Sequence, residues 1–279
     1  MTTEDGQFTY IVMTDDTTEA QTAAITGYAG ENPEGVQDIR IPEKIGDIPV
    51  TEIRSNFSNC TGLESLYIPQ YVSLLGYNSV VWLNGANPKK YDDQTPAAAL
   101  APEATTFVAY EVSEQNPYFS TQDGVLYNKE KTVLYKCPIG KTTITIPGTV
   151  NVLYAESFQG CQISTPFELT TDIAIGTKAF TSLNLNRRTT LTSVTVKKGN
   201  SDAWVNSYNC FESARIGTLS LEEGITSFGA KGMFDNVHIN TFKLPASLKT
   251  IEFRTFEYTG QKAIDDLYYA GSKEDFMSI

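Results

Sequence analysis

Histidine is almost absent from the sequence: His238 is the only one among 279 residues. It stands beside Ile239 in an apolar pattern, and we expect a structural or exposed residue there rather than a catalytic base. The G-x-S-x-G and H-E-x-x-H motifs do not occur. Paired acidic residues such as Asp92/Asp93 fall in predicted turns, where solvated charge is the ordinary explanation, although spacing alone leaves a glycosidase pair open. We therefore expect no enzyme and assign no catalytic, cofactor-binding or metal-binding residue.

Cysteine is also scarce, with four residues and no C-x-x-C pair. Zinc sites need closely spaced ligand pairs, so a metal site is not expected. Cys60 and Cys161 each stand three residues after a phenylalanine, Phe57 and Phe158. Equivalent positions of this kind suggest free thiols that line the core, because free cysteine behaves as a small buried hydrophobe. A disulfide remains the alternative.

The chain also lacks long apolar runs, and it has fewer basic than acidic residues. No run of about 18 apolar residues is present, so no segment is expected to insert into a membrane. The opening MTTEDGQF has neither the basic start nor the apolar run of a secretory signal, so an exported form would carry its signal outside this sequence. With 21 basic against 33 acidic residues, the formal charge is −12, and nucleic acid is not an expected partner.

What the chain does have is a repeated register. Nine times, one residue is followed three and then five positions later by two apolar ones, and the first residue is polar only at Lys141 and Ser164. The nine starts are 27, 44, 34, 23, 27, 25, 23 and 25 residues apart. A repeat of 20 to 29 residues is typical of a leucine-rich-repeat solenoid, in which each coil buries its apolar edge against its neighbours.

The last two apolar residues of each run predict a short strand whose middle residue points outward. Stacked coils would form a parallel β-sheet and align these middle residues in a column, a place where solenoids often bind ligands. The middle residues are Arg40, Tyr67, Glu111, Thr145, Glu168, Thr195, Ser220, Lys243 and Tyr268. The candidate ligand-binding residues are Arg40, Tyr67, Glu111, Glu168, Lys243 and Tyr268, together with Trp82 and Trp204. The alternative is that these are ordinary solvated residues and that either tryptophan covers an edge of the solenoid.

A phenylalanine recurs on the return side of each coil, after a short second apolar element. The series is Phe57, Phe158, Phe180, Phe211, Phe234 and Phe256. We predict an aromatic ladder inside the core, because rings of this size dominate core burial.

Residues 1–35 are predicted to cap the solenoid. FTYIV and AAITGY flank a polar turn, which indicates a β-hairpin, and a solenoid needs such a cap over its first coil. Residues 36–279 would then form about nine coils, with an insertion at 84–105 and a second β-hairpin at 120–137. The insertion is either a loosely packed loop or a binding loop.

Several strings resemble the BspA-type leucine-rich repeats of bacterial surface proteins, among them IRIPEKIGDIPVTEI, NPYFSTQDGVLYNKEKTVLYKCPIGKTTITIPGTV, KLPASLKTIEFRTF and LYYAGSKEDF. The resemblance runs from about residue 6 to the end and is weaker between residues 162 and 240. It implies a right-handed solenoid, mostly β with irregular or 3-10 return segments. It also implies a secreted or surface-attached, non-enzymatic protein used in adhesion or host interaction. We expect the outward strand residues and the 84–105 loop to contact a host or extracellular-matrix protein or a glycan. The alternative function is a passive spacer that presents another domain.

Overall fold

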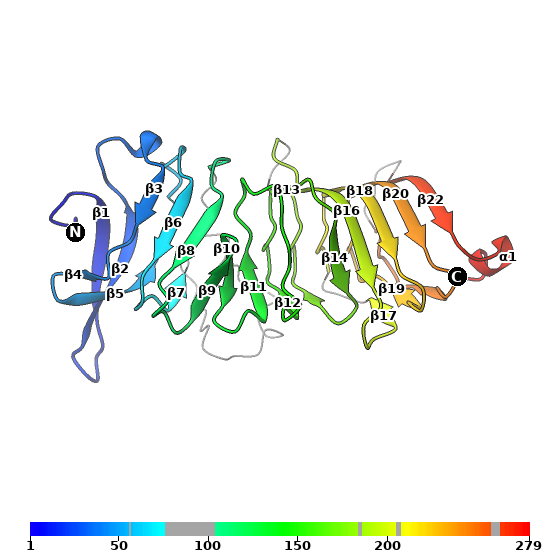
Figure 1. The fold of residues 1–279 in the computed structure, drawn as a ribbon, viewed down its shortest axis with the longest axis horizontal. Helices are drawn as coiled ribbons and strands as arrows, with labels where there is room; N and C mark the ends of the chain where they lie inside the picture. Colours follow the sequence, from blue (N-terminus) through cyan, green and yellow to red (C-terminus); the bar gives the residue numbers. More distant parts are fainter. Residues whose placement is uncertain (56, 76–103, 184–185, 205–207, 258–262) are drawn as a thin grey trace. The chain divides into compact units, whose positions relative to one another are not determined.

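The computed structural model describes residues 1–55, 57–75, 104–183, 186–204, 208–257 and 263–279. The chain divides into two compact units, residues 1–140 and 141–279. Nearly all regular structure is β-strand, and the one α-helix in the described ranges is the four-residue α1, Lys273–Phe276 (Figure 1). The predicted leucine-rich-repeat solenoid is confirmed. The boundary expected after residue 35 stays a prediction, since a cap and its first coils would pack as one unit.

Unit 1 begins with the predicted hairpin. Strands β1 (Phe8–Thr14) and β2 (Gln21–Tyr28) pair antiparallel. Strand β2 also pairs in parallel with β5 (Ile48–Ile53), so the hairpin covers the edge of the first coil. Ala23, Ala24 and Ile25 of β2 are completely buried, which shows that this strand contributes to the core. The remaining elements beside it are η1 (Pro33–Gly35), β4 (Lys44–Ile45) and β7 (Leu74–Leu75).

The strand sheet of unit 1 has three parallel members, β3 (Asp38–Arg40), β6 (Ser65–Ile68) and β8 (Ala109–Val112). Ile39, Leu66 and Tyr110 point inward from these strands and are buried. This alternation follows from the two-residue period of a strand, which places every second side chain on the same face. The predicted insertion at 84–105 lies outside the described residues except for its last two.

The predicted hairpin at 120–137 is present but belongs to a three-stranded antiparallel arrangement. It consists of β10 (Val125–Asn128) and β11 (Val133–Lys136), and β9 (Phe119–Gln122) pairs with β10 on the other side. Asp123 and Gly124 join β9 to β10, both with positive φ, at 52° and 73°. Asp-Gly with two positive φ angles is the preferred two-residue hairpin turn. The Asp123-Gly124 pair is therefore the sequence signal for this extra strand, which the two-stranded prediction did not include.

Unit 2 contains the longest continuous part of the solenoid sheet. Strands β16, β18, β20 and β22 lie side by side and are parallel (Figure 1). Strands β13 and β14 both pair with β16. The bounds are β13 (Gln162–Ile163), β14 (Phe167–Thr170), β16 (Thr190–Lys197), β18 (Arg215–Leu221), β20 (His238–Leu244) and β22 (Ile264–Tyr269).

Short strands on the return side of unit 2 form a second layer. Strands β17, β19 and β21 pair in parallel, and so do β12 and β15. Their bounds are β12 (Val152–Leu153), β15 (Ala174–Ile175), β17 (Ala203–Trp204), β19 (Ser227–Phe228) and β21 (Thr250–Ile251). The core therefore lies between the long strands and these short ones.

The predicted aromatic ladder is confirmed in unit 2. Consecutive rings from Phe158 to Phe256 stack at centroid distances of 4.8, 4.6, 5.3 and 5.2 Å. The first four of these side chains are completely buried. One ring from each coil thus fills the return side of the core.

One predicted strand does not form. Residues 141–147 carry the apolar pattern, and Ile144 is buried, but no strand is present there. The carbonyl of Thr142 accepts hydrogen bonds from the backbone N–H and the hydroxyl of Ser164, at 2.7 and 3.0 Å. Both bonds reach a single acceptor, whereas a parallel ladder needs a series of evenly spaced backbone bonds. The segment follows the path of a coil without strand pairing.

Candidate functional site

The outward residues of unit 2 align as the sequence predicted. Glu168 lies opposite Thr195, Thr195 opposite Ser220, Ser220 opposite Lys243, and Lys243 opposite Tyr268. Parallel pairing in constant register puts one residue of each coil in the same column. The three candidates Glu168, Lys243 and Tyr268 are therefore members of one surface, which we call the strand face.

A second outward column lies beside the first. Ser193 is paired with Thr218, Thr218 with Thr241, and Thr241 with Asp266. Together the two columns present mainly hydroxyl groups, each of which can donate and accept hydrogen bonds. The strand face is thus a polar array between a charged group at Glu168 and an aromatic group at Tyr268.

The strand face is hollowed at the end that carries Tyr268. The hollow has a volume of about 600 Å³ and is lined by Thr218, Thr241, Lys243, Leu244, Tyr268, Tyr269 and Ala270. Ligand pockets commonly have volumes of about 300 to 1,000 Å³. The Tyr268 side chain is 58% exposed, so its ring is available to a ligand. Hydroxyls, an ammonium and an aromatic ring therefore line one shallow hollow.

Tyr269 is held beside this hollow by a hydrogen bond and by a short helix. Its hydroxyl donates to the carbonyl of Ala246 at 3.2 Å. Its ring lies 5.4 Å from that of Phe276 in α1. Desolvation, followed by the negative charges of Asp275 and Glu223, raises the pKa of Tyr269, so the phenol remains a neutral donor. These contacts fix one wall of the hollow.

At the other end of the strand face, Lys197 lies between two carboxylates. Its Nζ is 3.3 Å from Oε1 of Glu168 and 3.9 Å from Oε1 of Glu222. All three side chains are substantially exposed, and exposed ion pairs of this kind contribute little to stability. Glu168 therefore already has a partner within the chain, and a ligand would have to compete with Lys197 for it.

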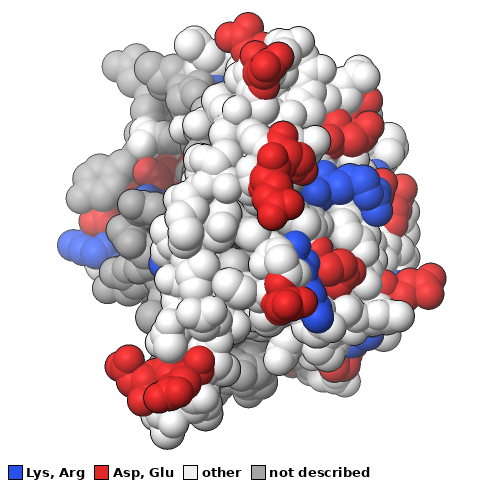
Figure 2. Space-filling model, turned by 90° about the vertical axis from the view of Figure 1, so that its left-hand side faces the viewer, with Lys and Arg blue, Asp and Glu red and all other residues white. Residues whose placement is uncertain are grey.

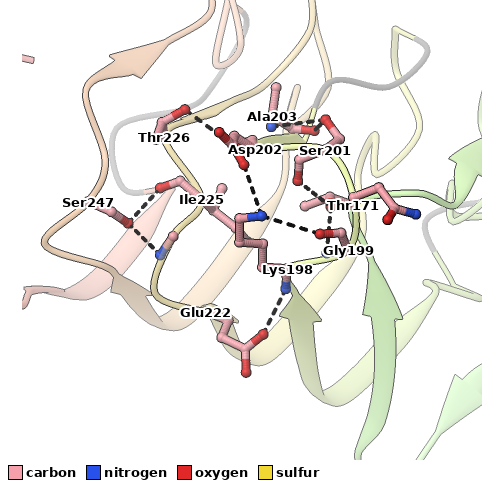
Figure 3. Close-up of polar contacts among 12 residues, drawn as sticks. Thr171, Lys198, Gly199, Ser201, Asp202, Ala203, Glu222, Ile225, Thr226 and Ser247 are labelled. Atoms are coloured by element: carbon pink, nitrogen blue, oxygen red, sulfur yellow. Dashed lines mark hydrogen bonds and ion pairs between the residues drawn. The ribbon is translucent and has the colours of Figure 1, made fainter.

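Polar contacts in the turns hold the ends of the strands (Figure 3). The backbone N–H of Lys198 donates to Glu222 at 2.7 Å, and its ammonium lies 2.9 Å from Asp202. Ser247 accepts from the N–H of Gly224 and donates to the carbonyl of Ile225, both at 2.9 Å. Each turn thus pairs with a neighbouring coil, because backbone groups that leave the ladder need other partners. These residues therefore support the strand face, and we assign them no role in ligand binding.

Unit 1 has its own column, formed by Arg40, Tyr67 and Glu111, whose strands pair in this order. The Arg40 guanidinium lies over the Tyr67 ring, 4.2 Å from its centroid, and 3.0 Å from the Glu111 carboxylate. The predicted alignment is confirmed. Arg40 thus contacts both of the other side chains, so one face of the Tyr67 ring is covered from within the chain.

The two tryptophan candidates are not on a described surface. Trp204 is completely buried in β17, and its ring contacts those of Phe211 and Phe234. Its indole faces the core, so Trp204 is not on the outward surface where the sequence placed it as a candidate. Trp82 lies outside the described residues.

All four cysteines are buried, and Cys60 and Cys161 line the core as their pattern suggested. Burial raises the pKa of the Cys60 thiol to about 11. In the described part of the chain, no group of three or more histidine, cysteine or acidic residues could hold a metal ion. Among the same residues, no helix has the length and apolarity that a membrane crossing needs.

Figure 2 looks onto the side of unit 1 that carries the N-terminal hairpin. Figure 2 shows acidic and basic side chains scattered there singly or in small groups, with uncharged surface between them. The regular array of outward residues in unit 2 is therefore the better defined candidate site.

Three of the solved structures similar to this chain are described here by their identity, coverage and TM-score. A leucine-rich cell surface protein from Faecalibacterium prausnitzii has 17% identity, with 100% of this chain and 97% of that chain covered, at a TM-score of 0.39. A leucine-rich repeat protein from Bacteroides ovatus has 11% identity, with 95% and 70% covered, at 0.40. The pneumococcal vaccine antigen PcpA has 14% identity, with 91% and 88% covered, at 0.35.

No curated protein matches the chain. A model of a protein family does match part of it. The model described as BspA type leucine rich repeat region matches six copies over residues 130–262. This range includes the aligned strands of unit 2 from β14 to β20 and the stacked phenylalanines. Residues 130–262 therefore carry leucine-rich repeats of the BspA type.

Proposed function

We propose that this chain is a non-enzymatic binding module exposed at the bacterial cell surface, and that its strand face binds a host or extracellular-matrix protein or a glycan. The observation that carries the proposal is the hollow of about 600 Å³ lined by Thr218, Thr241, Lys243, Tyr268 and Tyr269. Glycans are recognised by hydroxyl hydrogen bonds and by packing on aromatic rings, and a protein side chain can use the same groups. Surface location follows the family and is part of the proposal.

A passive spacer is the competing function. A spacer would need only the stacked core, and its outward residues would serve solubility. An exposed tyrosine beside a concave site favours binding, because tyrosine is enriched among the residues that dominate interface energies. The proposal therefore predicts that affinity depends on the groups at the hollow.

The test begins with a glycan array and a panel of immobilised extracellular-matrix proteins. Dissociation constants for each ligand found are then measured with the unmodified chain, Tyr268→Ala and Lys243→Ala. We expect each substitution to weaken binding about tenfold, which corresponds to about 1.4 kcal/mol. Tyr208→Ala is the matched control, because Tyr208 is 46% exposed and does not line this hollow.

Two results would oppose the proposal. If no ligand is found in either panel, the spacer function is favoured. If ligands bind Tyr268→Ala and Lys243→Ala as tightly as the unmodified chain, the strand-face hollow is not the site.

A further inference from the structure

Five outward hydroxyls in the middle of the strand face have no hydrogen-bond partner within the described part of the chain. They belong to Ser193, Thr195, Thr218, Ser220 and Thr241. All five residues are half-buried, so their hydroxyls are held at the surface of the sheet. By contrast, the hydroxyl of the neighbouring Thr192 donates to the carbonyl of Ile163 at 3.1 Å. Each outward hydroxyl keeps one donor and two acceptor positions for a ligand.

The spacing of these hydroxyls follows from the parallel ladder. Neighbouring strands lie about 4.8 Å apart, and two outward positions of one strand, such as Thr218 and Ser220, lie about 6.6 Å apart. A linear polysaccharide that runs across the strands advances by about one strand spacing per sugar. Each pyranose ring carries polar groups on both edges, and its apolar face can pack on threonine methyl groups. The ladder therefore presents hydroxyls to both edges of each sugar.

A polysaccharide fits this surface better than a protein segment does. The buried centre of a protein interface is depleted in serine and enriched in aromatic residues, and a few large side chains carry most of its binding energy. Thr195, Thr218 and Ser220 offer only hydroxyl and methyl groups in the middle of the face. A hydroxyl that is buried without a partner costs free energy, and a sugar supplies a hydrogen-bonding group for each one.

Charged residues of the strand face alternate in sign from coil to coil. In chain order they are Glu168 on β14, Lys197 on β16, Glu222 directly after β18, Lys243 on β20 and Asp266 on β22. The strands of the two lysines are two ladder steps apart, which is about 9.6 Å. Basic groups at every second coil match a polymer that is acidic at every second sugar. The net charge of −12 disfavours a polymer that is acidic at every sugar.

Both lysine ammonium groups are accessible to a carboxylate of the ligand. Lys243 is exposed, and its ammonium forms no ion pair or hydrogen bond within the described ranges. Lys197 lies 3.3 Å from Glu168 and 3.9 Å from Glu222, and its side chain is 40% exposed. Exposed pairs of this kind contribute little to stability, so a ligand carboxylate can replace one of the two partners. Charge-assisted hydrogen bonds to the two lysines would fix the register of the polymer.

We propose that the strand face binds a linear polysaccharide in which acidic and neutral sugars alternate. The polymer runs across the strands with one sugar over each coil, and its carboxylates lie at Lys197 and Lys243. Neutral sugars then face Glu168 and Asp266, which would repel a carboxylate. The proposal rests on the binding function proposed above for the strand face, and it names the class of ligand.

Fluorescently labelled hyaluronan oligosaccharides are the probe, because glucuronate and N-acetylglucosamine alternate along them. Chitin oligosaccharides of the same lengths are the neutral counterpart, since they contain N-acetylglucosamine alone. Dissociation constants are measured by fluorescence anisotropy with the full chain. We expect hyaluronan affinity to rise from the disaccharide to the hexasaccharide and then to level off, because the outward column crosses five strands. The chitin hexasaccharide should bind about tenfold more weakly, because it lacks the charge-assisted bonds.

Two variants separate this proposal from binding at the hollow alone, because neither Lys197 nor Thr195 lines the hollow. We expect Lys197→Gln to weaken the hyaluronan hexasaccharide about tenfold and to leave chitin affinity unchanged. Thr195→Val keeps the shape of the side chain and should weaken both probes. Lys249→Gln and Thr250→Val are the matched controls, because both residues are exposed at the return side, where β21 (Thr250–Ile251) lies. Thermal unfolding verifies the folding of each variant.

Several results would overturn the proposal. Hyaluronan oligosaccharides could fail to bind, or the disaccharide could bind as tightly as the hexasaccharide. Chitin could bind as tightly as hyaluronan, and the ligand would then be a neutral glycan. Lys197→Gln and Thr195→Val could leave affinity unchanged, and the ligand would then be confined to the hollow. The proposed function fails on a different result, namely unchanged binding by Tyr268→Ala and Lys243→Ala, and a matrix protein bound at the hollow would uphold it without any polysaccharide.

Discussion

Removing a ring from the middle of the aromatic ladder should destabilise unit 2 more than removing the ring at its end. Phe211 is completely buried and lies 4.6 Å from Phe180, with ring planes 2° apart, and 5.3 Å from Phe234. Phe256 is half-buried and lies 5.2 Å from Phe234. The two positions are equivalent in the repeat and differ in burial. Comparing their alanine variants therefore isolates the effect of coil stacking.

The expected magnitudes follow from the burial of each ring. Phe211→Ala should cost about 3 to 5 kcal/mol, because it removes a buried ring and leaves a cavity between two others. Phe211→Leu retains most of the apolar volume and loses two ring pairs, which are worth about 1 to 3 kcal/mol together. Phe256→Ala should cost about 1 to 2 kcal/mol, since only part of its surface is removed from water.

Urea unfolding followed by circular dichroism measures these free energies, and calorimetry gives the unfolding midpoint. For Phe211→Ala we expect the thermal midpoint to fall by roughly 10 to 20 °C. The ladder would not be a main source of stability if Phe256→Ala cost as much as Phe211→Ala. A cost below about 1 kcal/mol for Phe211→Ala would refute the argument, because a cavity at a rigid stacked position cannot be that inexpensive.

Two further predictions concern ionisable groups. Asp172 accepts hydrogen bonds from the backbone N–H groups of Asn200 and Ser201, and these bonds lower its pKa below the ordinary 3.8. The ionised Asp172 therefore stabilises the folded chain fully above pH 3.8. This stabilisation is lost as the pH falls through the lower pKa of the folded state. The difference in unfolding midpoint between the unmodified chain and Asp172→Asn should therefore be constant near neutral pH and shrink below about pH 4; a difference independent of pH would contradict this. The four cysteines are buried, and burial raises the pKa of Cys60 to about 11, so a thiol reagent at pH 8 should label none in the folded chain and all four in denaturant. Rapid labelling of the folded chain would show that the coils open.

The core and the alignment of the outward residues could be predicted from the sequence because both follow from one period. A strand alternates its side chains, so a repeated apolar-x-apolar pair determines which residue faces outward in every coil. Constant register then aligns Lys243 with Tyr268, as the structure shows. The ladder follows in the same way, because phenylalanine recurs at one position of the repeat.

Features that depend on neighbours outside the repeat were not predictable in this way. Trp204 has polar neighbours in sequence, and only the positions of Phe211 and Phe234 show that its indole is enclosed. Arg40 and Glu111 stand 71 residues apart, and their contact across Tyr67 depends on β3 and β8 flanking β6. A column of candidate residues can therefore be partly satisfied within the chain, which a list of outward positions does not reveal.

Strand β22 shows the same limit. Its apolar pattern, Ile264, Leu267 and Tyr269, matches that of the covered strands, so the sequence predicts one more ordinary coil. Exposure of Leu267 distinguishes it, and exposure depends on what lies on the other side of the strand.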